Sequence, residues 1–98
     1  MIRHVVMFRW SADVGAEHIA ALSAALDELA GTIPMIRSYR HGVDCGLNEG
    51  NFDYVVVGDF ATVDHYIAYR DHPAHQAFIQ KFIVGNVESR SAVQYAID

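Results

Sequence analysis

The chain has 98 residues, with seven Lys and Arg against twelve Asp and Glu, a net charge of −5, and 52% hydrophobic residues. A chain of this length forms one domain with a modest core, so we expect residues 1–98 to be a single domain. The few cations are scattered, which disfavours nucleic acid and anionic membrane surfaces as partners.

The single cysteine and the apolar runs of the sequence bear on disulfide formation and on cellular location. Cys45 is the single cysteine, so no disulfide can form within the chain. Arg3, His4 and Arg9 interrupt the first ten residues, which therefore do not resemble a signal peptide. The longest mostly apolar run, IAALSAAL, is too short to span a bilayer. We expect a cytoplasmic protein.

The first third of the chain predicts a strand followed by a helix. Residues 2–10 alternate, with His4, Val6 and Phe8 on one face and Val5 and Met7 on the other. Residues 17–31 carry apolar side chains at helical spacing, and Gly31 followed by Pro34 ends that helix.

The rest of the chain predicts two strands, a broken helix and a last strand. Residues 36–43 and 52–60 alternate as strands on either side of a turn at 46–51. Residues 63–71 are helical, and a second helical run at 72–83 begins at Pro73, which suits a first helical turn. Residues 87–97 alternate as a fourth strand.

This order, β-α-β-β-α-β, predicts an α+β, ferredoxin-like fold with a four-stranded antiparallel sheet and both helices on one face. Val5, Met7, Val55 and Val57 would then face solvent on the other side of the sheet. Burying each such side chain is worth roughly 1.5–3 kcal/mol. We therefore expect a homodimer with sheet facing sheet, which closes into a dimeric α/β barrel.

The element order, the early histidine His4 in HVVMFRW and the motif HPAHQAF at 72–78 resemble the stress-responsive dimeric α/β barrel (Dabb) family. The resemblance covers essentially the whole chain and implies the fold and the dimer. One plant member of the family cyclises a linear polyketide with a tyrosine and a histidine, which correspond to Tyr69 and His75 here. Its first-strand histidine corresponds to His4, whereas Tyr54 stands where it has another pocket histidine.

The residues of the motif support the same chemistry. If Pro73 is the first helical residue, His72 is the N-cap and His75 lies in the first turn, where the helix dipole favours a neutral imidazole. A neutral imidazole can act as a general base, and Tyr69 could orient a substrate or stabilise an enolate. The other interpretation is structural, because Pro and a polar cap are ordinary features of a helix start.

We therefore expect a pocket between sheet and helices for a small apolar or aromatic ligand. His75 and Tyr69 are the predicted catalytic pair, and the predicted ligand contacts are His4, Tyr54, His72 and Phe78. We expect no metal and no cofactor, since there is no H-E-x-x-H motif and Cys45 stands alone. The three remaining histidines, expected at the surface, receive no role: His18, His41 and His65.

Three functions agree with this pattern. The first is a polyketide cyclase or lyase-type enzyme that carries out a carbonyl condensation on an aromatic or polyketide-like compound without a cofactor. The second is a non-catalytic, stress-related dimer. The third is a haem-handling monooxygenase, which other dimeric α/β barrels exemplify. A cavity into which His4, Tyr69 and His75 point would favour the first over the second.

Overall fold

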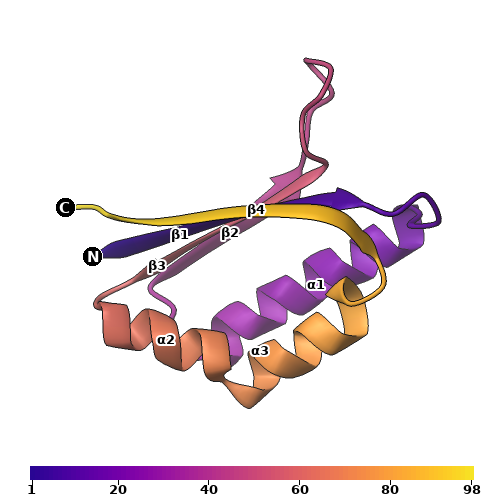
Figure 1. Ribbon diagram of the computed structural model, residues 1–98. Coiled ribbons are helices and arrows are strands. Elements are labelled where there is room, and N and C mark those ends of the chain that lie inside the picture. The colour runs from indigo at the N-terminus through magenta and orange to yellow at the C-terminus, as the bar shows by residue number, and fades with distance from the viewer.

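The computed structural model of the protein describes residues 1–98 and has the predicted order of elements. The strands and helices have these bounds: β1 Ile2–Trp10, α1 Ala16–Thr32, β2 Ser38–Val43, β3 Tyr54–Phe60, α2 Val63–Asp71, α3 Pro73–Phe78, a π-helical turn Ile79–Ile83, and β4 Val87–Ala96. All helices lie on one face of the sheet, and the two termini meet at the same end of it (Figure 1). None of the helices has the length and hydropathy needed to cross a bilayer.

The four strands form one antiparallel sheet in the order β2-β3-β1-β4. In the central pair, Val5 lies opposite Val57 and Met7 opposite Val55. On the other side of β1, the β1–β4 pairing places Arg90 opposite Phe8. Because residues directly opposite each other share a face of an antiparallel sheet, this register decides which β4 side chains face the helices.

The core lies between the sheet and the helices. The central strands contribute Val6, Phe8 and Val56, and α1 contributes Leu22 and Leu26; all five side chains are buried. Leu22, Leu26 and Leu29 recur at the helical spacing expected from the sequence. The ferredoxin-like α+β fold predicted from the pattern is confirmed.

The opposite face of the sheet, which we call the outer face, has no helix over it. The apolar side chains predicted there lie on it, and Met7, Val93 and Tyr95 are 36%, 55% and 46% exposed. The long connection between β2 and β3 rises from the sheet on this side, away from the helices (Figure 1). Arg3 and Asp59 add a bidentate ion pair to the same face, at 2.8 and 2.9 Å.

Several bounds differ from the prediction by one or two residues, and β2 begins at Ser38 instead of residue 36. Two differences have a local structural cause. The strand expected at 52–60 begins at Tyr54, because the carboxylate of Asp53 accepts a hydrogen bond from Trp10 N (2.8 Å) and replaces the ladder carbonyl there. The helical run expected at 72–83 changes at Ile79 into a π-helical turn, in which Val84 N donates to Ile79 O (3.0 Å). Such π-turns are rare and occur frequently at functional sites.

Candidate functional site

A partly open cavity of about 260 Å³ lies between the sheet and the segment that runs from α2 to the π-helical turn. We call it the sheet–helix cavity. It is lined by His4, Val6, Phe8, Leu26, Tyr39, Val56, Tyr66, Tyr69, Arg70, His75, Phe78, Ile79, Ile83 and Arg90. Most of its wall is apolar or aromatic, and a few polar groups converge on it, which is typical of small-molecule sites.

Four of the six predicted site residues line this cavity: His4, Tyr69, His75 and Phe78. The other two do not. The imidazole of His72 is occupied as the N-cap of α3, where its Nδ1 accepts a hydrogen bond from Ala74 N (3.0 Å). The Tyr54 hydroxyl is held 2.7 Å from both the Ser23 hydroxyl and His41 Nδ1, on the α1 side of the core.

The local structure fixes the protonation of His75. Its Nδ1 lies 2.9 Å from the carbonyl oxygen of Arg70, near the end of α2. A carbonyl can only accept, so Nδ1 carries the proton and donates it, and Nε2 of the neutral ring keeps its lone pair. Nε2 has no hydrogen-bond partner within the chain. Burial lowers the pKa of His75, and the charge of Arg90 lowers it further.

The break between α2 and α3 brings Tyr69 and His75 together, although not through the tyrosine hydroxyl. The two rings pack with their centroids 4.3 Å apart. The Tyr69 hydroxyl is instead 2.6 Å from the hydroxyl of Tyr39, on β2. Burial raises the pKa of Tyr69 and raises that of Tyr39 to about 12, so both phenols are neutral at physiological pH.

Gly58 makes the tyrosine pair possible. It lies on β3 directly opposite Tyr39. A Cβ at this position would stand 3.2 Å from the Tyr39 ring and 3.1 Å from the Phe60 ring. The missing side chain therefore leaves the space in which the Tyr39 ring lies as its hydroxyl reaches Tyr69.

His4 comes to the cavity from β1. Its Nδ1 lies 2.8 Å from the amide nitrogen of Gln94, its neighbour across the β1–β4 pair. The amide nitrogen can only donate, so Nδ1 accepts and the proton of the neutral ring is on Nε2. Burial lowers the pKa of His4 to about 4, with smaller contributions from Arg90 and His75. His4 therefore offers a donor, whereas His75 offers an acceptor.

A second polar network, which the sequence did not indicate, ties β2 to α1. His41, expected at the surface, has a side chain only 11% exposed, with Nε2 2.7 Å from an Asp27 carboxylate oxygen and Nδ1 2.7 Å from the Tyr54 hydroxyl. His18 was also expected at the surface, but its Nε2–H donates to Phe82 O (3.0 Å). A histidine on an alternating polar strand gives no signal of such pairing, since its partners come from the neighbouring strand β3 and from helix α1.

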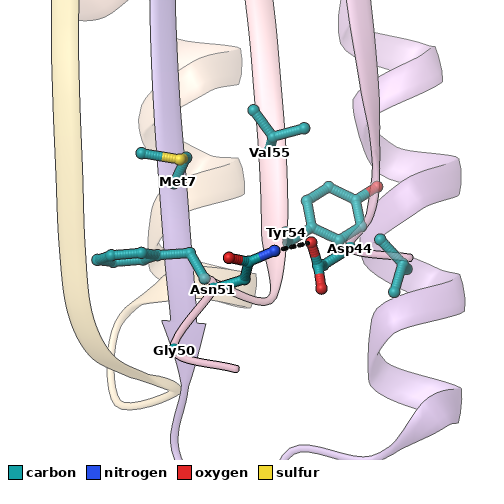
Figure 2. A pocket seen from close by; sticks show the side chains of 8 residues that line it. Met7, Asp44, Gly50, Asn51, Tyr54 and Val55 are labelled. Atoms are coloured by element: carbon teal, nitrogen blue, oxygen red, sulfur yellow. Dashed lines mark hydrogen bonds between the residues drawn. The ribbon is translucent and has the colours of Figure 1, made fainter. Parts of the chain in front are cut away.

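A larger hollow, of about 450 Å³, lies where the β2–β3 connection leaves the outer face. Figure 2 shows Met7 and Val55 there on neighbouring strands, with Asn51 donating to a carboxylate oxygen of Asp44 (3.2 Å) beside them. This hollow is open, and no histidine lines it. It belongs to the uncovered sheet surface, and its residues offer no acid–base pair. No cluster of three or more His, Cys, Asp or Glu side chains is arranged to hold a metal ion.

Known proteins with the same fold include several dimers. A dimeric ferredoxin-like protein of unknown function from Thermobifida fusca is 38% identical, with a TM-score of 0.90 over 98% of this chain and 90% of that one. A dimeric protein of unknown function from Bacteroides fragilis is 27% identical (TM-score 0.83; 98% and 95% covered). The hydroxynitrile lyase of Passiflora edulis shares the fold at 20% identity (TM-score 0.86; 99% and 93% covered).

Among proteins of curated function, none matches the sequence significantly. The family profile of the stress-responsive A/B barrel (Dabb) domain, by contrast, matches residues 2–97. That match agrees with the resemblance carried by His4, Tyr69 and the HPAHQAF motif. The chain belongs to the stress-responsive A/B barrel (Dabb) domain family.

Proposed function

We propose that the protein is a homodimeric, cofactor-independent enzyme that binds a small one-ring carbonyl compound in the sheet–helix cavity and uses His75 Nε2 as a general base. The observation that carries the proposal is the convergence of three separate elements on one cavity. His4 comes from β1, Tyr69 from α2 and His75 from α3.

The polar groups of the cavity are complementary to proton abstraction next to a carbonyl. His75 Nε2 is an acceptor with no partner in the chain, whereas His4 Nε2 carries a proton. In the Tyr39–Tyr69 pair one hydroxyl hydrogen lies between the two oxygens, so the other is left to donate to a ligand. Donors that hold the carbonyl oxygen stabilise the enolate, while the imidazole takes the adjacent proton.

The lowered pKa of His75 limits the range of substrates. It keeps the ring neutral and able to accept a proton near neutral pH, but it also makes the ring a weaker base. The proton removed must therefore be acidic already, as it is beside a ketone, and more so between two carbonyls. Carbonyl condensation and its reverse, retro-aldol-type cleavage, both meet this requirement.

The size of the cavity supports this class of ligand over a haem. At about 260 Å³ it falls just below the range of roughly 300–1,000 Å³ usual for drug-sized ligands. A ring with a short side chain matches that volume, and a macrocycle does not. A non-catalytic dimer, the other alternative, needs neither a cavity nor an unpartnered imidazole nitrogen within it.

The homodimer in this proposal is supported by the outer face. Val5, Met7, Val55 and Val57 form its centre and have no covering element within the chain. A second sheet would bury them, and the Thermobifida relative is described as dimeric. Because the sheet–helix cavity opens on the other side of the sheet, this pairing leaves it accessible.

A direct test is hydrogen exchange at the carbon beside a ketone. Propiophenone, a one-ring ketone, is incubated with the protein in D₂O, and loss of its α-proton signal is followed by NMR. We expect the protein to accelerate exchange over buffer. His75→Gln should reduce that acceleration by about 10²–10⁴-fold, the usual contribution of a general base.

The matched control is His65→Gln, which removes an exposed histidine of α2 that does not line the cavity. It should exchange propiophenone as the parent does. Binding is monitored separately through the ¹⁵N shift of His75 Nε2. If propiophenone shifts this signal but exchange is no faster than in buffer, His75 is not a base and the proposal is wrong.

A further inference from the structure

The sheet–helix cavity has a positively charged wall in a negatively charged chain. Two arginines line it, Arg70 and Arg90, and no Asp or Glu lines it. The chain as a whole carries a net charge of −5. The cavity that holds His4 and His75 is therefore lined by positive charge in a chain that is negative overall. The proposed base chemistry does not by itself require this positive charge.

The two arginines differ in whether they have a partner. Arg70 is paired with Asp71: its guanidinium donates two hydrogen bonds, of 2.9 and 3.1 Å, to the carboxylate. Two of its N–H groups therefore already have a partner. Arg90 makes no side-chain hydrogen bond and no ion pair in the chain. Arg90 is thus a free bidentate donor at the cavity wall.

The sheet register directs Arg90 toward the cavity. Arg90 lies opposite Phe8, and Gln94 lies opposite His4, whose ring it contacts on the helix side. The two β4 residues are four apart and therefore share that face. The charge of Arg90 acts on His4, His75 and Tyr69, lowering the pKa of both imidazoles, as expected for a cation beside all three.

From this geometry we infer that the natural ligand carries a carboxylate, which Arg90 binds at the cavity mouth, while its ring and carbonyl group lie deeper among the apolar wall, His4 and the tyrosine pair. The inference rests on the proposed function and names its substrate class, a small one-ring oxo acid. Since Arg90 is an exposed residue, the carboxylate keeps part of its hydration. A fully buried carboxylate would lose its hydration, and the attraction within the ion pair often does not compensate for the free energy of that desolvation.

The test compares two ligands that differ only in charge. The probes are 4-oxo-4-phenylbutanoate and its neutral amide, 4-oxo-4-phenylbutanamide, both of which have a ketone beside an exchangeable CH₂. Dissociation constants come from the ¹⁵N shift of His75 Nε2 at low ionic strength. A charge-assisted pair predicts that the acid binds about tenfold to a hundredfold more tightly than the amide.

Arg90→Gln should bring the two dissociation constants to within about twofold of each other, since only the charge-assisted pair distinguishes the ligands. The charge-matched control is Arg37→Gln, which removes an exposed cation that does not line the cavity. It should retain the preference for the acid. Added salt should weaken binding of the acid and leave that of the amide unchanged.

The possible failures are distinguishable. If acid and amide bind the parent equally well and both shift His75, the cavity binds carbonyl compounds and the carboxylate inference is wrong. A preference for the acid that survives Arg90→Gln refutes the role of Arg90. If neither probe, nor propiophenone, shifts His75, the proposed function itself fails and the carboxylate inference fails with it.

Discussion

Acidification should destabilise this protein through one buried histidine. The pKa of His4 is about 4 in the folded chain, against an ordinary value of 6.5, because burial among Tyr66, Tyr69 and the strand side chains disfavours the charged ring. Between these two values the unfolded chain binds a proton that the folded chain cannot. The free energy of unfolding therefore falls as pH falls from about 6.5 to about 4, and the loss is complete below that window.

The magnitude follows from the shift. Lowering the pKa of His4 from 6.5 to about 4 corresponds to at most roughly 3 kcal/mol once the full window has been crossed, at about 1.4 kcal/mol per pH unit. Between about pH 7 and pH 5 the same linkage gives about 2 kcal/mol. The ring also borders the cavity, where water reduces the penalty, so we expect a measured loss of about 1–2 kcal/mol.

Urea denaturation at these two pH values, at one protomer concentration, measures the loss. The comparison variant is His4→Asn, whose side-chain oxygen can accept from Gln94 as His4 Nδ1 does but does not titrate. Each variant is compared with itself across pH, so any constant cost of the substitution cancels. An equal loss in parent and variant would show that His4 is protonated as easily in the folded as in the unfolded chain, and would refute the reasoning.

Two further predictions concern packing. Gly58→Ala places a Cβ 3.2 Å from the Tyr39 ring and should lower the free energy of unfolding by about 1–3 kcal/mol. Gly42→Ala, also in a strand but with nothing within 4 Å, is the control; equal effects in urea denaturation would contradict the close fit. Val57→Lys, at the centre of the outer face, should convert the dimer to a monomer, read by size-exclusion chromatography with light scattering. Val63→Lys, on an exposed helical residue, should remain dimeric; a dimeric Val57→Lys would place the interface elsewhere.

The local signals in the sequence were sufficient for the architecture. Period-two alternation in β1 and β3 and helical spacing in α1 each determine which side chains share a face, because those periods are properties of the backbone itself. Apolar residues on both faces of β1 were equally visible in the sequence, and they predicted that the outer face of the sheet would be apolar. Pro73 and His72 predicted the start of α3, since a fixed φ and a polar cap suit that position wherever it occurs.

The site depended on contacts that no local pattern encodes. Tyr54 and Tyr69 are both tyrosines in apolar surroundings, yet one hydroxyl bonds to His41 and Ser23 and the other to Tyr39. The partners are 13 to 31 residues apart in sequence, so only the pairing of β2 with β3 and the packing of helices on the sheet select them. The protonation of His75 is likewise set by the Arg70 carbonyl, which the α2–α3 break brings within reach.

The sequence alone therefore determined the order of elements, the two faces of the sheet and the candidate pair of Tyr69 and His75. Only the tertiary structure decided which residues meet at the cavity, which nitrogen of each imidazole holds its proton and which arginine is free. The physical reason is that secondary structure follows from neighbours along the chain. A hydrogen-bond partner or an unpaired charge is instead defined by groups that come together only when strands and helices pack.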